Sequence, residues 1–287
     1  MASHRNVLGS QYAGGVVLLL VSAVAFSTTG VFAKGVEAGA WAVILWRGVF
    51  AATSTTLWAA SRGGLSSEFF GMGWAGLAVG IVGAIGTAAL IPAFKLTTVA
   101  NVALIYAAAP FLAAIMAWMT LGERVSKLTA LGAGVALVGV GIIVSGSIGQ
   151  LNLTGDALAL SMTLAMSIIM VIYRAYPRTP SAGPSVLQSV FLFPMAIALG
   201  EPFSIAPEEM AILAGFGVFH AIASVTLAEG AKRVPAGQTA LIGALETPLA
   251  PIFALLILSE VASQTTLFGG AIVLAAVLIS LLQKPAK

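Results

Sequence analysis

Residues 101–123 read NVALIYAAAPFLAAIMAWMTLGE, and 137 positions later residues 238–260 read QTALIGALETPLAPIFALLILSE. Each stretch is apolar and long enough to cross a bilayer as a helix, contains proline near its middle, and ends in glutamate. The letters ALI recur in register, as do the first amide (Asn101 and Gln238) and the last carboxylate (Glu123 and Glu260). Self-similarity at a fixed shift predicts that one structural unit occurs twice in the chain.

The composition places the chain in a membrane. Of its 287 residues, 59% are hydrophobic and only 8% are charged, whereas soluble domains carry about 25% charged residues. Cysteine is absent, which excludes disulfides, thiolate metal sites and a cysteine nucleophile. The 13 basic residues are scattered between apolar runs rather than gathered in a patch, so we expect no nucleic-acid partner. The apolar excess must face lipid.

Apolar runs bounded by Gly, Pro and charged residues predict ten transmembrane helices and no soluble domain. At about 20 residues per span, ten helices with short loops use the whole chain. The run that contains Pro194 is the shortest. The predicted spans are 13–33, 39–60, 71–92, 98–121, 128–147, 154–174, 184–200, 209–229, 235–258 and 264–283.

The basic residues follow the positive-inside rule for ten spans. If the N-terminus is cytoplasmic, ten Lys and Arg residues fall in cytoplasmic segments, two (Lys34 and Lys95) fall outside, and Arg47 lies within a span. We therefore expect both termini in the cytoplasm. Arg5 and the apolar run after it could instead form a secretory signal. That run continues to Ala33 and has a counterpart in the second half, so we expect it to be retained as the first helix.

The ten spans divide into two five-helix units, residues 1–150 and 151–287, within one membrane domain. Because five is odd, the second unit enters the membrane from the opposite side. Inverted repeats are common in secondary transporters, since the two halves can exchange conformations around one site. The sequence thus predicts an all-α membrane protein of two inverted five-helix repeats. Further matched pairs are Lys95 with Lys232, Gly132 with Gly269 and, at a shift of 140, Ala25, Ser27 and Lys34 with Ala165, Ser167 and Arg174.

Each repeat contains a basic residue, an Ala-rich helix with a central proline, and a small residue before glutamate. These residues are Lys95, Pro110, Gly122 and Glu123 in the first half, Lys232, Pro248, Ser259 and Glu260 in the second, and Trp46-Arg47 is added in the second span. Their order and spacing resemble the EamA-type members of the drug/metabolite transporter superfamily, over nearly the whole chain. The resemblance implies a ten-helix, exporter-like carrier with a central cavity.

The superfamily moves amino acids, nucleobase-type metabolites, quaternary amines and other small solutes, and the likeness is greatest to the branch that exports aromatic and other amino acids. The second half departs from the family pattern at Ser259, where glycine is usual, and at Glu246 beside its proline.

Glu246 is the first candidate for a substrate contact, because ionisable groups at membrane depth are costly and tend to be functional. It lies about eleven residues into span 235–258, near the midplane, and Pro248 and Pro251 follow it. Proline frees a carbonyl of the preceding turn, and broken helices present such groups to substrate. The carboxyl group could accept a substrate ammonium or a proton. The alternative is a protonated glutamate bonded between helices.

His220 and Arg47 are the other titratable candidates inside spans. His220 could relay a proton or bridge two helices as a neutral imidazole, and we favour the bridge. Arg47 could pair with a substrate carboxylate, or it could snorkel outward and bond helix ends. Because the resemblance carries this arginine across substrates, we favour a structural or gating role.

Uncharged residues could line the cavity. Asn101 and Gln238 are amides at matched positions, for which hydrogen bonding between helices is an equal alternative. Tyr106 lies deep enough to favour the cavity, whereas Trp46 could also belong to an interfacial aromatic belt. Ser27 and Thr28 are plausible lining of the first helix. Gating or structural roles, including caps of the next helix, are expected for Pro110, Pro248, Pro251, Glu123 and Glu260.

The sequence favours a secondary carrier that exports small metabolites, with amino acids as the expected substrates, by alternating access across a bacterial inner membrane. Drugs, quaternary amines or nucleobase-type metabolites are the alternative cargo, and a channel is the alternative class. No nucleotide-binding loop is present, so direct ATP drive is not expected, while proton coupling and uniport both stay open. We expect no enzyme activity, no cofactor and no metal, and a monomer in the lipid bilayer.

Overall fold

The structure is a computed structural model, which describes residues 2–96, 102, 105–106, 108–145, 153–203, 205–259 and 264–281. Every secondary-structure element within these ranges is a helix. Five of the helices or helix pairs are long and apolar enough, by length and composition, to cross a membrane, and four further apolar helices are shorter. These findings confirm an all-α, multi-pass membrane protein.

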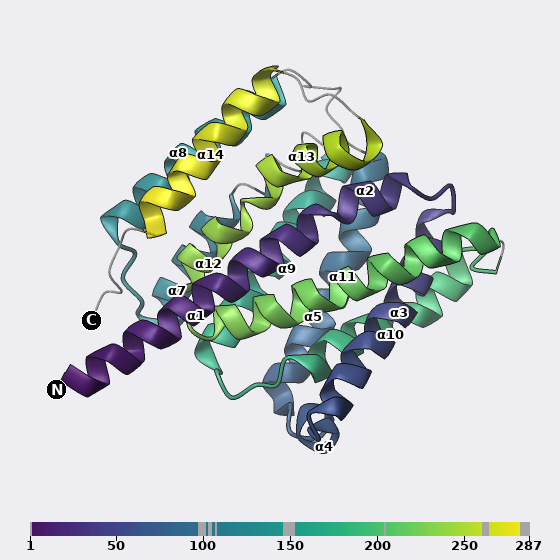
Figure 1. Cartoon of the computed structure of the whole chain (residues 1–287), viewed down its shortest axis with the longest axis horizontal. Helices are drawn as coiled ribbons and strands as arrows, with labels where there is room; N and C mark the ends of the chain where they lie inside the picture. Colours follow the sequence, from purple (N-terminus) through teal and green to yellow (C-terminus); the bar gives the residue numbers. More distant parts are fainter. Residues whose placement is uncertain are drawn as a thin grey trace.

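The helices follow the predicted spans (Figure 1). Most boundaries agree within a few residues, although α1 begins earlier and a short helix, α4, follows the second span. Part of the predicted span 98–121 lies outside the described residues. In chain order the helices are α1 (Ala2–Ser27), α2 (Thr29–Lys34), α3 (Ala40–Ser61), α4 (Leu65–Phe69), α5 (Gly73–Leu96), α7 (Ala109–Leu121), α8 (Lys127–Ser145), α9 (Leu153–Ala175), α10 (Ala182–Leu199), α11 (Pro207–Ala231), α12 (Ala236–Gly243), α13 (Glu246–Leu258) and α14 (Gln264–Leu281).

The two stretches of sequence that match best also fold alike. α7 and α13 are both 13 residues long, and their first residues are 137 positions apart. Each begins after a tight turn: Ala108 N–H donates to the carbonyl of Ile105, and Leu245 N–H donates to the carbonyl of Ile242, both at 3.1 Å. A proline follows within the first turn of each new helix, where it is tolerated, and its ring would clash with a continuous helix. The sequence repeat is therefore a repeat of backbone structure.

Packing between the helices repeats as well. Exchanging the halves converts α1 into α9, α3 into α10, α5 into α11, α7 into α13, and α8 into α14. The exchange turns the contact of α5 with α9 into that of α11 with α1, and the contact of α10 with α5 into that of α3 with α11. The contact of α7 with α9 likewise becomes that of α13 with α1, and the contacts α3–α10 and α8–α14 convert into themselves. This is the pattern expected of two inverted five-helix repeats; the predicted boundary at 150/151 lies outside the described residues.

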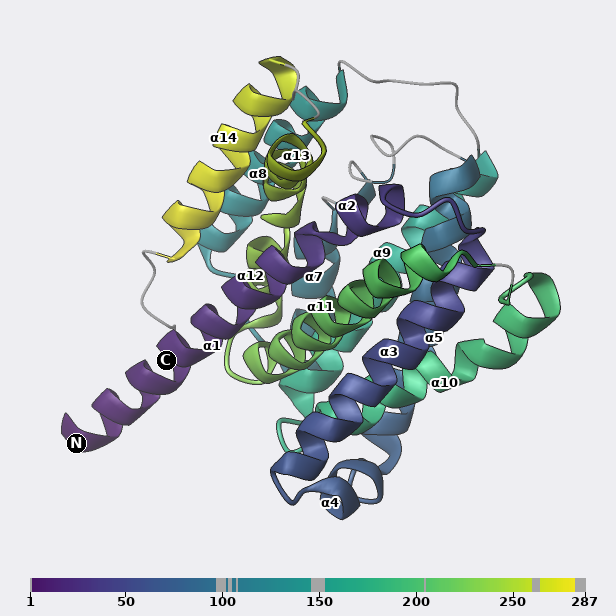
Figure 2. The ribbon, with the colours of Figure 1, turned by 45° about the vertical axis from the view of Figure 1, so that its right-hand side comes forward.

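The helices α8 and α14 lie side by side at one edge of the bundle, away from α3 and α10, in both views (Figures 1 and 2). The largest apolar core lies between this edge and α11, with contributions from α1, α7, α9, α12 and α14. Many of its members are alanines, which let helices in a membrane approach closely. Representative core residues are Leu19, Ala113, Met170, Ile242 and Val277.

The first turns of α1 and the last turn of α14 lie at the left of Figure 1, while the ends of α2 and α10 lie at the right. The chain therefore begins and ends its helical part on the same side of the bundle, as an even number of crossings requires.

Candidate functional site

Glu246 is the first residue of α13, so the interruption after α12 places its carboxyl group at a break in the helix. The side chain is partly buried. In the part of the chain that the structure describes, it forms no hydrogen bond or ion pair. Tyr106 lies within electrostatic range of it, and the Tyr106 hydroxyl lies 3.6 Å from the place that a Cβ on Gly243 would take. The carboxyl group of Glu246, the phenol of Tyr106 and the backbone of Gly243 therefore lie near one another at this break.

A second interruption, at Thr28, separates α1 from α2. The Ser27 hydroxyl donates to the carbonyl of Val24 at 2.6 Å, and the Thr28 hydroxyl donates to the carbonyl of Ala25 at 2.7 Å. Both hydroxyls therefore stabilise the bend of their own helix by local hydrogen bonds. Since α2 packs against α13, the two interruptions lie in neighbouring parts of the bundle.

His220 connects this region to α11. Its ring meets Phe26 edge to face, with 5.7 Å between the ring centroids, and its Nε2 lies 3.5 Å from the hydroxyl of Ser224 one turn further along. Phe26 packs against the same apolar cluster as Tyr106 and Leu245. Phe26 therefore joins the imidazole of α11 to the residues around the α12–α13 break.

Arg47 faces α11 from α3. Its side chain is only 5% exposed, and the guanidinium carbon lies 5.3 Å from the ring centroid of Phe216. His220 lies within electrostatic range of it. The Nε atom is fully buried and has no hydrogen-bond partner, and no carboxylate among the described residues pairs with the guanidinium.

Two other predicted cavity residues lie elsewhere. Trp46 donates its indole N–H to the carbonyl of Pro202 at 2.6 Å, which fixes it beside the α10–α11 connection. Gln238 is buried at the start of α12 and accepts a hydrogen bond from the hydroxyl of Tyr12 at 3.2 Å. Pro110 and Pro248 lie in the first turns of α7 and α13. Asn101, Glu260 and the side chain of Pro251 lie outside the described residues.

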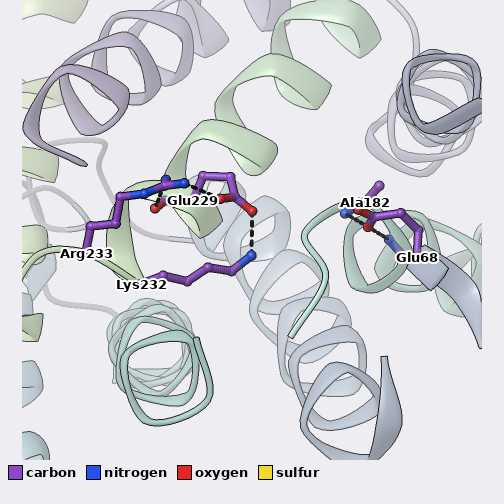
Figure 3. Close-up of polar contacts among 6 residues, drawn as sticks. Glu68, Ala182, Glu229, Lys232 and Arg233 are labelled. Carbon is purple, nitrogen blue, oxygen red and sulfur yellow. Dashed lines mark hydrogen bonds and ion pairs between the residues drawn. The ribbon is translucent and has the colours of Figure 1, made fainter. Parts of the chain in front are cut away.

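Glu123 lies just beyond α7 and forms an ion pair with Arg174 at the end of α9, 2.5 Å from Nε to Oε1. Arg174 also donates to the carbonyl of Lys232 at 3.4 Å. Lys232 and Arg233 both pair with Glu229 (Figure 3). The ends of α7, α9 and α11 are thereby tied together on one side of the bundle.

The same side carries an unusual helix cap. Glu68, from the short helix α4, accepts hydrogen bonds from the backbone N–H groups of Ala182 at 2.8 Å and Gly183 at 3.4 Å (Figure 3). These groups begin α10, so the carboxylate meets the positive end of the helix dipole. α10 is therefore anchored at this face by a residue that lies more than a hundred positions earlier.

Gln188 was missed by the sequence analysis. Its Nε2 donates to the hydroxyl of Thr87 at 2.9 Å, and a Cβ on Gly83 would stand 2.3 Å from its Oε1. Thr87 and Gly83 are the repeat counterparts of Ser224 and His220, 137 positions away. In the first half, the side-chain amide of Gln188 from α10 occupies the space beside Gly83. In the second half, the imidazole of His220, on α11 itself, takes the corresponding place. The replacement of histidine by glycine at matched positions was the signal in the sequence.

The sequence model of the EamA-like transporter family matches residues 13–145 and, a second time, residues 153–282. The chain belongs to this family. Membership identifies it as a membrane transporter of small solutes and supports the view that it is not an enzyme. The two matches coincide with the two halves whose helices and contacts repeat.

A solved protein crystal structure shares the fold: it aligns with 94% of this chain and 97% of its own length, with a TM-score of 0.82 at 18% sequence identity. No curated protein matches the sequence.

Proposed function

We propose that this transporter exports amino acids across a bacterial inner membrane by alternating access, with Glu246 receiving the substrate ammonium. The observation that carries the proposal is the break between α12 and α13, which leaves this carboxyl group beside Tyr106 and outside any ion pair among the described residues. A carboxylate at such a depth is costly unless a cation or a proton accompanies it. An amino acid supplies the cation, and aromatic neighbours can contact its side chain.

The exchange symmetry of the helix contacts supports alternating access. An inverted repeat has two equivalent arrangements, which open the site to opposite sides. The Glu123–Arg174 pair joins the end of α7 in the first unit to the end of α9 in the second. A carrier breaks such ties once per cycle, whereas a channel keeps one continuous pore.

Counterflow in proteoliposomes tests the proposal. Proteoliposomes that contain the purified protein are loaded with unlabelled L-phenylalanine, L-leucine or L-threonine, and uptake of the same amino acid in labelled form is measured. Counterflow of choline and of a nucleoside is measured in parallel. We expect counterflow of amino acids and its loss in Glu246→Gln. Glu208→Gln, an exposed carboxylate at the start of α11, is the matched control. Counterflow of choline or the nucleoside alone would overturn the proposed cargo, and flux without counterflow would favour a channel.

The absence of cysteine allows a direct test of the two access states. Thr247→Cys places one thiol beside Glu246. A membrane-impermeant maleimide should label it in intact cells and also in inside-out vesicles, and substrate should change the two rates in opposite directions. Labelling from a single side under every condition contradicts alternating access.

The proposed orientation places both termini in the cytoplasm, because ten basic residues then lie inside and two lie outside. A C-terminal fluorescent-protein fusion should fluoresce, and a C-terminal alkaline phosphatase fusion should be inactive. We further propose that the monomer is the transporting unit, which cross-linking in native membranes can test.

A further inference from the structure

We infer that Gly243 sets the size of the solute that the carrier accepts, by leaving room beside Tyr106 for a large apolar side chain. The inference rests on the proposed transport of amino acids and specifies which of them are preferred. It starts from a contact between matched positions of the two repeats. Tyr106 and Gly243 are 137 residues apart and each follows the letters ALI. The Tyr106 hydroxyl lies 3.6 Å from the place that a Cβ on Gly243 would take.

A contact between counterparts lies on the pseudo-twofold axis, because the exchange of the two halves carries each residue into the other. The helix pairs α3–α10 and α8–α14 also convert into themselves, so the axis passes through both. These pairs lie on opposite sides of the bundle in both views (Figures 1 and 2). In carriers with inverted repeats, substrate binds near the midplane at the interface of the repeats. Tyr106 and Gly243 therefore lie where a substrate is expected.

Helix packing does not require glycine at position 243. Gly243 is buried in the last turn of α12, yet a Cβ there would meet only two side-chain tips of the described residues within 4 Å. These are the Tyr106 hydroxyl and, at 3.9 Å, the Cε of Met170, and both distances are ordinary contacts. At Gly80 and Gly217, in contrast, a Cβ would stand 2.9 Å and 2.4 Å from an atom of a neighbouring helix.

The backbone conformation does not require this glycine either. Within the described ranges, the glycines with a positive φ are Gly63, Gly73 and Gly122, whereas Gly243 has the conformation of its helix. Alanine is more favourable than glycine in a helix and would fit at this place. The glycine therefore keeps a space free at a cost in stability, next to the carboxyl group that has no ion pair.

The groups around Gly243 suit an apolar side chain that is attached to an amino group. Met170, Ile242 and Tyr106 belong to one apolar cluster, and methionine adapts to contacts of irregular shape. Glu246 lies three residues beyond Gly243, about one helical turn. An amino acid whose ammonium binds at Glu246 can therefore place its side chain beside Gly243. The wild-type carrier should prefer L-phenylalanine and L-leucine to L-alanine.

The selectivity of counterflow is the primary test. Counterflow of L-phenylalanine, L-leucine and L-alanine is measured for the wild type and for Gly243→Ala. The added methyl group should lower the ratio of L-phenylalanine to L-alanine counterflow about 10-fold or more, since one methylene in an apolar site discriminates by about 10- to 200-fold. A wild type that favours L-alanine, or an unchanged ratio in Gly243→Ala, overturns the inference. Counterflow of none of the three contradicts the proposed transport of amino acids itself.

Thermal unfolding in detergent separates selectivity from packing. Gly243→Ala should melt at the same temperature as the wild type or higher, because the methyl group fits and alanine favours the helix. Gly80→Ala is the matched control. Its methyl group would meet the side chain of Leu187 at 2.9 Å, so it should lower the melting temperature and leave the ratio of amino acids unchanged. A lower melting temperature in Gly243→Ala would mean that this glycine serves packing, which overturns the inference.

Removal of the Tyr106 hydroxyl tests the pairing of the two residues. This oxygen is the described atom nearest to the methyl group that Gly243→Ala adds. The double variant Gly243→Ala, Tyr106→Phe should therefore regain part of the preference for L-phenylalanine over L-alanine. A double variant with the same ratio as Gly243→Ala would overturn the assignment of the space to this pair.

Discussion

Gly122 and Ser259 end α7 and α13 in the same left-handed backbone conformation, with φ angles of 66° and 56°. They are matched positions of the two repeats, 137 residues apart. Gly122 adopts this conformation freely, and its N–H donates to the carbonyl of Trp118 at 3.1 Å. A residue with a Cβ costs roughly 1–2 kcal/mol in this region. The fold therefore imposes the same turn on both halves, although only one has the residue that suits it.

Exchange of these two residues gives the first prediction. Ser259→Gly should raise the free energy of unfolding by about 1 kcal/mol, since the strain of the left-handed serine is relieved. Gly122→Ser should lower it by a similar amount. Gly134→Ser, at a helical glycine with open space around it, is the control and should change little. Thermal unfolding in detergent measures all three, and a Gly122→Ser protein as stable as the wild type would contradict the shared turn.

The contact between α8 and α14 supplies the second prediction. A Cβ on Gly139 would stand 2.8 Å from the backbone oxygen of Gly269, so the helices touch through their backbones there. Gly139→Leu should force them apart and destabilise the protein by about 1–3 kcal/mol. Gly141→Leu adds the same side chain two residues away, where nothing lies within 4 Å, and should be tolerated in lipid. Equal melting temperatures for the two variants would show that the pair does not pack closely.

The ion pair of Glu123 and Arg174 leads to the third prediction. Their side chains are 25% and 30% exposed, so Glu123→Gln should change stability by less than about 1 kcal/mol. The substitution should instead make the region around Glu246 easier to reach from the face that carries the ion pair, because the ends of α7 and α9 separate more easily. Maleimide labelling of Thr247→Cys in inside-out vesicles should become faster. The charge-exchanged double variant Glu123→Arg, Arg174→Glu should restore the slow labelling rate. An equal labelling rate in all of these variants would exclude a gating role for the pair.

The polar contact that Gln188 makes inside the bundle gives the fourth prediction. Gly83→Ala should displace the amide from Thr87 and cost about 1 kcal/mol, the usual contribution of one hydrogen bond. Thr87→Val should cost a similar amount by removing the acceptor. Because both changes break the same bond, the double variant should be little worse than either single one. Fully additive losses in thermal unfolding would mean that Gly83 matters for another reason.

Local signals in the sequence predicted most of the architecture. Continuous apolar runs gave the spans, because a helix in lipid must satisfy its own backbone and present apolar side chains. α9, α10 and α11 begin and end within about two residues of the predicted spans 154–174, 184–200 and 209–229. Pro110 and Pro248 marked the positions near which α7 and α13 begin after a break, because proline removes a backbone donor and clashes with the preceding turn. Pro92 and Pro194, in contrast, lie inside the continuous helices α5 and α10.

Tertiary structure alone decided which polar groups meet. Trp46 and Arg47 are neighbours in sequence, yet the first bonds to Pro202 and the second lies over the ring of Phe216, with no carboxylate partner among the described residues. Gln188 reaches Thr87, a hundred and one positions away. The sequence determines the number, length and breaks of the helices because those depend on nearby residues. The environment of a buried charge depends on how separate helices cross, and only the packed bundle determines that.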